Sequence, residues 1–344
     1  MTAGASRCPQ CGTEIAATLL ACPACHRLVH ADLLKQLATD AHKATQSGDR
    51  SAALTAWRRA LELLPPDSRQ YAAVSDKVMA LSREVDAKPE SFADAQKRST
   101  WAKRLGGLGV LGALIWKFKF ALGVVLTKGK LLLVGLTKSS TLFSMILSLG
   151  VYWAAWGWKF AAGLIGSIYI HEMGHVAMLR RYGIAATAPM FIPGIGAVIR
   201  LKQYPADVRE SARVGLAGPM WGLGTALACY AVFQLTGIPF WGAIARVGAW
   251  INLFNLLPVW QLDGGRGFDA LSRRQRWFAT AVVAAAWVFT KEGLLVLLAF
   301  GGVFRAWAGA APQEDDARAF WEYVFLVAAL SLLSAVPVPM GALD

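Results

Sequence analysis

Charged residues are scarce in this sequence: they make up 17% of 344 positions, and only 22 residues are aspartate or glutamate. An ordinary soluble protein carries about 25% charged residues, so this deficit argues against a soluble enzyme. Hydrophobic residues occupy 56% of the positions, and the mean hydropathy is +0.42. The composition therefore favours a membrane protein with a polar head, because the first hundred residues are polar whereas almost everything after Trp101 is apolar.

Two further features that the sequence lacks limit the possible classes of function. The sequence has no G-x-x-x-x-G-K-[ST] motif, which argues against an ATP-driven enzyme. A charged segment followed by an apolar one does not precede the first cysteine, so we expect no cleavable signal peptide and a cytosolic head. The net charge of +13 comes from Lys and Arg at the ends of apolar runs, where the positive-inside bias places them. We therefore do not expect nucleic acid as a partner.

Four of the five cysteines lie near the start of the chain as two C-x-x-C pairs, Cys8 with Cys11 and Cys22 with Cys25. Each pair can present two thiolates to one tetrahedral zinc ion, and thiols stay reduced in the cytosol. The spacing, with a proline after the first cysteine of each pair, resembles a zinc ribbon. We predict a ribbon over residues 1–30 with one structural zinc; the alternative is four incidental cysteines.

A helical pattern follows from residue 31 to 87, with a turn at Ser47-Gly48-Asp49 and a stop at Pro65-Pro66. It resembles a single tetratricopeptide unit, and a plain helical hairpin fits equally well. Residues 88–138 begin as a charged connector and continue as an apolar stretch interrupted by lysines. We interpret that range as a linker with segments lying in the membrane interface.

The apolar runs predict an all-α, polytopic membrane body. Four spans are expected within a core at 139–274, and residues 275–344 add one to three membrane helices. The expected spans cover 139–158, the run that ends at Leu179, 214–236 and 240–260. The basic clusters of the core all fall on one side of the membrane, which indicates a cytosolic amino terminus. Two short apolar segments around Pro193-Gly194 predict a small membrane-associated β-hairpin.

The second span contains His171-Glu172-Met173-Gly174-His175. Histidines at i and i+4 share one face of a helix, as two ligands of one metal require, and Glu172 beside them can accept a proton from water. Polar groups inside a lipid-spanning helix are costly and point to function. The alternative is a polar trio that bonds only to neighbouring helices.

A hydrolytic zinc usually has three protein ligands and one open position. The other three histidines all lie in the head, so the third ligand must come from elsewhere. Asp263 is the best candidate, because Pro258 can open the fourth span before it and Gly264-Gly265 permits a sharp turn after it. The alternative is that Asp263 is an ordinary helix-end residue.

Together, the H-E-x-x-H motif and the N-x-x-P-x-x-x-L-D-G motif from Asn255 to Gly264 resemble the site-2 protease family of intramembrane zinc metalloproteases. Ala217-Gly218-Pro219, on the span between them, is also typical of that family. The resemblance implies that His171, His175 and Asp263 bind zinc, that Glu172 is the general base, and that Asn255 holds the substrate backbone. With the structural zinc of the predicted ribbon, two zinc ions are expected in all, one catalytic and one structural.

The expected activity is hydrolysis of peptide bonds in or near transmembrane segments, as in regulated intramembrane proteolysis, in a multi-pass protein of the bacterial inner membrane. Its partners would be transmembrane proteins and the lipid bilayer. We further expect the hairpin over 191–200 to pair with an unwound substrate strand, with the N–H of Val198 as one donor. Two alternatives stay open: an inactive zinc-binding scaffold whose head binds a cytosolic protein, and a hydrolase of soluble or lipid-linked peptides.

Overall fold

The computed structural model describes residues 5–87, 140–187, 189–192, 196–199, 201, 203–259 and 262–338, which are mostly helical. The predicted linker and interfacial segments at 88–138 lie outside the described residues. So do Pro193, Gly194 and Arg200 of the predicted hairpin, Trp260 at the end of the fourth predicted span, and both chain ends, 1–4 and 339–344.

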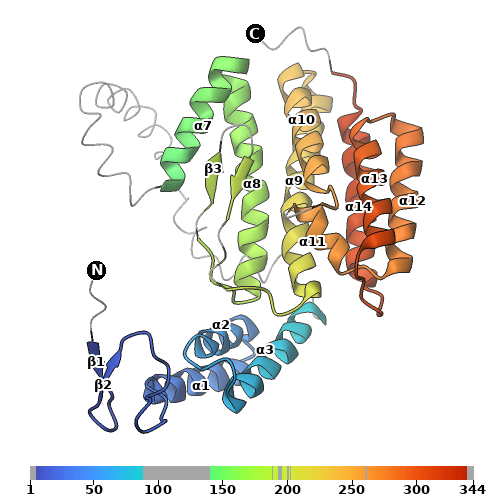
Figure 1. The fold of residues 1–344 in the computed structure, drawn as a ribbon. Helices are drawn as coiled ribbons and strands as arrows, with labels where there is room; N and C mark the ends of the chain where they lie inside the picture. The colour runs from blue at the N-terminus through green and yellow to red at the C-terminus, as the bar shows by residue number, and fades with distance from the viewer. Residues whose placement is uncertain are drawn as a thin grey trace, which may run out of the picture.

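The head lies at one end of the molecule and has a strand pair followed by three helices (Figure 1). Its strands pair antiparallel with Ser6 opposite Ile15. The side chain of Asp49 accepts a hydrogen bond from the N–H of Ala52 and so starts the second helix, while Gly48 before it adopts a φ of 78° that suits glycine. The elements of the head are β1 (Ala5–Arg7), β2 (Glu14–Ala16), α1 (Ala31–Gln46), α2 (Arg50–Leu61) and α3 (Arg69–Ala87).

The body is a row of helices with one small hairpin beside α7 and α8 (Figure 1). Strands β3 and β4 pair antiparallel with Phe191 opposite Ala197, as predicted for this segment. The elements of the body are α7 (Ser140–Trp156), α8 (Trp158–Arg181), β3 (Met190–Ile192), β4 (Gly196–Val198), α9 (Val208–Thr236), α10 (Pro239–Asn255), α11 (Asp263–Asp269), α12 (Arg273–Thr290), α13 (Leu294–Ala308) and α14 (Ala317–Ser334).

Among these helices, α9 and α14 are long and apolar enough to cross a membrane, and α7 and α13 contain shorter apolar segments. Two boundaries differ from the sequence prediction. Helix α9 starts at Val208 because Asp207 caps it through the N–H of Glu210, so the basic segment forms its first turns. Helix α10 ends at Asn255 rather than at Trp260, since Pro258 supplies no backbone donor to continue it.

Apolar packing joins the head to the body. Leu54 and Trp57 of α2 share one buried cluster with Leu179 and Tyr182 at the end of α8 and with Val214 of α9. The backbones also meet closely, since a Cβ added at Gly183 would lie 2.6 Å from the backbone nitrogen of Thr55. The head therefore packs directly against the ends of the helices that carry the candidate site.

Buried ion pairs reinforce this contact. Arg58 of α2 pairs with Glu210 of α9, and the side chains are 5% and 1% exposed. Asp86 near the end of α3 accepts a hydrogen bond of 2.8 Å from Nε of Arg213. Burial raises the pKa of Asp86, but the hydrogen bond and charge of Arg213 outweigh it and hold that pKa below its ordinary value. The head is thus fixed by charge as well as by apolar contact.

Candidate active site

Helix α8 carries the two histidines and the glutamate of the predicted motif in its interior. His171, Glu172 and His175 are all buried. The Nε2 atoms of the two histidines lie 3.1 Å apart, as expected for positions one helical turn apart on the same face. The helix therefore presents two imidazole nitrogens to one point in space.

Asp263, the first residue of α11, faces these nitrogens. Its Oδ2 lies 3.1 Å from Nε2 of His171 and 3.3 Å from Nε2 of His175. The turn before α11 is tight, because a Cβ added at Gly264 would lie 1.9 Å from the carbonyl oxygen of Leu256. Glycine at that position lets the chain fold back, so the carboxylate reaches the histidines.

The spacing of the three donor atoms suits a zinc ion. Zinc bonds of about 2.0–2.1 Å to nitrogen and oxygen in a tetrahedron place neighbouring donors about 3.3 Å apart. The three observed separations are 3.1, 3.1 and 3.3 Å. Three protein ligands also leave the fourth position of a tetrahedron for water or substrate. The donor set and its geometry thus fit a catalytic rather than a closed structural site.

The outer nitrogens of both histidines have hydrogen-bond acceptors. Nδ1 of His171 lies 2.7 Å from Oδ1 of Asn252 in α10, and Nδ1 of His175 lies 2.8 Å from the carbonyl oxygen of Val214. Each acceptor favours the tautomer with hydrogen on Nδ1, which leaves the Nε2 lone pair free for a metal. Sequence reasoning missed Asn252; an asparagine inside an apolar helix, three residues before Asn255, was the available signal.

Glycines on α9 make room for this arrangement. A Cβ added at Gly218 would lie 2.2 Å from Nε2 of His175 and 2.7 Å from Nε2 of His171, and one at Gly222 would lie 2.0 Å from Oδ1 of Asn252. Real Cβ atoms do not approach other atoms so closely. Gly218 and Gly222 therefore let α9 pack directly over the donor atoms and their hydrogen bonds.

A cavity of about 300 Å³ opens beside the donors. Its polar residues include His171, Glu172 and Asn255, and its apolar wall includes Tyr152, Trp250 and Phe254. Neither the carboxylate of Glu172 nor the amide of Asn255 makes a hydrogen bond to another of the described residues. Both groups are therefore free to interact with water or a ligand in the cavity.

The hairpin borders the same cavity through Ala197. The N–H of Phe191 donates to Oγ of Ser144 on α7, 3.0 Å away, and so points away from β4. Antiparallel pairs alternate, so Phe191 and its partner Ala197 form a pair without mutual hydrogen bonds, and Met190 bonds with Val198. The N–H of Val198 thus points toward β3, which corrects its predicted role as a donor to substrate. The backbone of Ala197 faces the other edge of β4.

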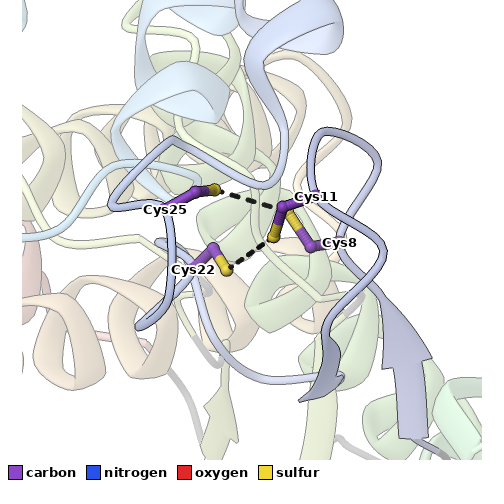
Figure 2. Close-up of side chains that lie close together, drawn as sticks. All are labelled: Cys8, Cys11, Cys22 and Cys25. Carbon is purple, nitrogen blue, oxygen red and sulfur yellow. Dashed lines mark hydrogen bonds between the residues drawn. The ribbon is translucent and has the colours of Figure 1, made fainter.

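The four cysteines of the head come together in the structure (Figure 2). Sγ of Cys8 lies 3.8 Å from that of Cys25, and Sγ of Cys11 lies 3.6 Å from that of Cys22. Zinc–sulfur bonds of about 2.3 Å in a tetrahedron place sulfurs about 3.8 Å apart. Hydrogen bonds with Thr13 lower the pKa of Cys11 to about 6, which favours its metal-binding thiolate form. The cluster thus fits a closed, four-sulfur metal site.

Comparison with known proteins finds a family match over a segment that includes part of the candidate site. Residues 159–239 match the sequence profile of Peptidase family M50, the site-2 protease family. This segment contains the H-E-x-x-H motif and all of α9, and the match confirms the resemblance found in the sequence. Asp263 and the head lie outside the matched segment.

The curated relatives are named as zinc metalloproteases. Zinc metalloprotease MJ0392 of Methanocaldococcus jannaschii is 28% identical over 144 residues, which are 40% of this chain and 41% of that protein. Putative zinc metalloprotease Rip3 of Mycobacterium tuberculosis is 30% identical over 209 residues, 52% of each chain. Probable zinc metalloprotease EGY1, chloroplastic, of Arabidopsis thaliana is 26% identical over 153 residues, 31% of this chain and 28% of that protein. The chain thus spans about half of these relatives or less. No solved structure gives a significant match.

Proposed function

We propose that this chain is an intramembrane zinc metalloprotease that hydrolyses peptide bonds in or near the transmembrane segments of other proteins. The observation that carries the proposal is the triangle of His171, His175 and Asp263 donor atoms, 3.1–3.3 Å apart, with Glu172 next to it in a cavity. The names of the relatives support the same reaction class.

The proposed zinc ligands are His171, His175 and Asp263. Zinc at that position would act as a Lewis acid that polarises the scissile carbonyl and lowers the pKa of water. Glu172 accepts the proton of the attacking water and returns it to the leaving nitrogen. Asn255, which lines the cavity, holds the substrate backbone with its amide.

The backbone of the substrate needs partners once its helix is unwound, since each unpaired N–H or C=O group in the membrane costs several kcal/mol. The open edge of β4 at Ala197 can supply them by pairing with the substrate as an added strand. This role follows from the alternation of the hairpin and from the place of Ala197 on the cavity wall.

The proposal extends to the head and to the membrane. Cys8, Cys11, Cys22 and Cys25 hold a second, structural zinc in a ribbon over residues 1–30, ahead of a tetratricopeptide-like module at 31–87. The core covers 139–274 and further membrane helices cover 275–344. The head and the ends of α8 and α9 that it contacts face the cytosol, which suits a multi-pass protein of a bacterial inner membrane and lets the head bind a cytosolic protein.

Replacing Glu172 tests the proposed function. Wild type and Glu172→Gln are purified, analysed for zinc, and incubated in lipid nanodiscs with a synthetic single-span peptide. Glu172→Gln keeps two zinc ions per chain and loses at least a hundredfold in kcat, because general acid–base catalysis contributes about 10²–10⁴. Glu314→Gln, which removes one carboxylate from an exposed pair with Arg209, is the matched control and keeps the wild-type rate.

The same experiment separates the alternatives. A protein that binds two zinc ions and cuts no peptide is a scaffold rather than an enzyme. Turnover by Glu172→Gln at the rate of Glu314→Gln would reject Glu172 as the base. Cleavage confined to short soluble peptides would favour a peptide-trimming hydrolase over an intramembrane protease.

A further inference from the structure

The lining of the cavity beside Glu172 includes both polar and apolar side chains. His171, Glu172 and Asn255 are among the polar ones, and the proposed reaction takes place beside them. Tyr152 and Trp250 are among the apolar ones. Peptide hydrolysis uses only the polar groups, so the apolar part of the lining calls for a separate explanation.

Aromatic rings from two helices form the apolar wall. Tyr152 on α7 stacks on Trp156 at a centroid distance of 5.7 Å, and Trp250 on α10 stacks on Phe254 at 6.1 Å. Trp250 and Phe254 as whole residues are 43% and 39% exposed. Both line the cavity, so an apolar or aromatic group bound there can cover part of their exposed surface.

Gly248 limits one side of the cavity. It lies on α10 one turn before Asn252, and its carbonyl oxygen accepts a hydrogen bond of 2.7 Å from Nδ2 of Asn252. A Cβ added at Gly248 would meet only Oγ of Ser167, at 3.1 Å, and both residues line the cavity. A Cβ at Gly248 would already be in tight contact with Ser167, so a larger residue at 248 would extend into the cavity next to the reacting groups.

The edge of β4 that faces away from β3 indicates how a substrate peptide would approach the cavity. A peptide paired with Ala197 would lie along the cavity wall, and alternate side chains of a strand point to opposite faces. One side chain close to the scissile bond would then enter the cavity. We propose that this cavity is a specificity subsite that accepts one large apolar side chain, aromatic by preference, next to the cleaved bond. This inference rests on the proposed protease function.

Peptides that differ at one residue test the subsite. The bond cut in a synthetic single-span peptide is located by mass spectrometry, and the residues on either side of it are then replaced in turn by Phe, Leu and Ala. Wild type should cleave peptides with Phe or Leu on one side of the bond at least tenfold faster, in kcat/KM, than the Ala peptide. On the other side the same replacements should have a smaller effect.

Gly248→Leu fills the proposed subsite. It should lower kcat/KM for the Phe peptide at least tenfold and change that for the Ala peptide less than threefold. Gly224→Leu is the matched control, because a Cβ at Gly224 meets nothing within 4 Å, and it should keep the wild-type preference. Trp250→Ala is a second test of the subsite if Gly248→Leu fails to fold. It removes part of the apolar cavity wall and should reduce the preference for the Phe peptide over the Ala peptide.

Binding gives a readout without turnover. In the Glu172→Gln background, the Kd of the Phe peptide should be several-fold lower than that of the Ala peptide, and adding Gly248→Leu should abolish this difference. Equal kcat/KM for the Phe, Leu and Ala peptides in wild type would overturn the subsite and leave the protease intact. So would an unchanged preference in both Gly248→Leu and Trp250→Ala. Failure of wild type to cut any peptide would overturn the protease and the subsite together.

Discussion

At the scale of the residue, the candidate metal centre depends on a position that has no side chain. Gly218 of α9 faces Nε2 of both His171 and His175, and a Cβ there would approach them to 2.7 and 2.2 Å. The space beside these nitrogens is the space that a bound ion needs. A methyl group at position 218 would therefore compete with the metal directly.

Gly218→Ala should accordingly reduce zinc binding at the membrane site by at least tenfold, because the added Cβ displaces the histidine rings. Changes around a metal site that disturb ligand orientation typically cost about 10–100-fold in affinity. Zinc per chain, measured after dialysis against graded zinc buffers, should fall from two toward one. Gly224→Ala, on the same helix with open space around it, should retain two.

The residues proposed to carry the chemistry can be predicted from the sequence. The groups that accept hydrogen bonds from the two histidines cannot. His171, Glu172 and His175 stand in one short motif, and a carboxylate at Asp263 was expected from the turn that precedes it. Asn252 lies 81 residues from His171, its hydrogen-bond partner. The acceptor for His175 is a backbone carbonyl at Val214, which any residue type supplies, so no sequence pattern marks it.

At the scale of the element, the β3–β4 hairpin borders the cavity of the candidate site through Ala197. The apolar segments around Pro193-Gly194 predicted two strands, and the structure has them at 190–192 and 196–198. Which residues face the open edge depends on the hydrogen bond from Phe191 to Ser144 of α7. That contact between distant segments is invisible in the local pattern, so the sequence alone does not distinguish Ala197 from Val198 as the outward donor.

Ala197→Pro should lower cleavage of a transmembrane peptide at least tenfold, mainly through a higher KM, because proline removes the outward N–H that pairs with substrate. Zinc content should stay at two. Ala197→Gly keeps the N–H and is the control; it should lose no more than a fewfold. Equal activity of the proline and glycine variants in the peptide assay would exclude strand pairing at this residue.

At the scale of the whole molecule, the head packs directly against the body through buried contacts. Arg58 donates to the carbonyl oxygens of Tyr182 and Tyr204 and pairs with Glu210. In the sequence, Arg58 and Glu210 look like ordinary surface charges on helices, and they lie 152 residues apart. Their pairing depends on how the head packs, which local patterns do not encode. A mostly helical chain with helices apolar enough to cross a membrane was predictable; the contact between the head and the body was not.

Removing Arg58 should therefore loosen the head. Arg58→Met leaves Glu210 buried without its partner, and breaking a buried pair in this way costs about 3–5 kcal/mol. Arg59→Met, one residue along α2 and exposed, is the matched control with an expected change within about 0.5 kcal/mol. Denaturant unfolding in detergent, followed by the fluorescence of Trp57 in an otherwise Trp-substituted protein, measures the difference. Equal stability of the two variants would contradict the buried pair.

The position of the cleaved bond is the sharpest test of intramembrane proteolysis by this protein. Wild-type protein in nanodiscs is incubated with a single-span protein, and the masses of the intact products locate the cut. Wild type should cut within the apolar span or at its edge. This cut should be lost in Glu172→Gln, lost after zinc is removed, and restored when zinc returns. Cuts found only in the soluble parts of the substrate, or a cut that persists in Glu172→Gln, would show that the protein is not a zinc-dependent intramembrane protease of this kind.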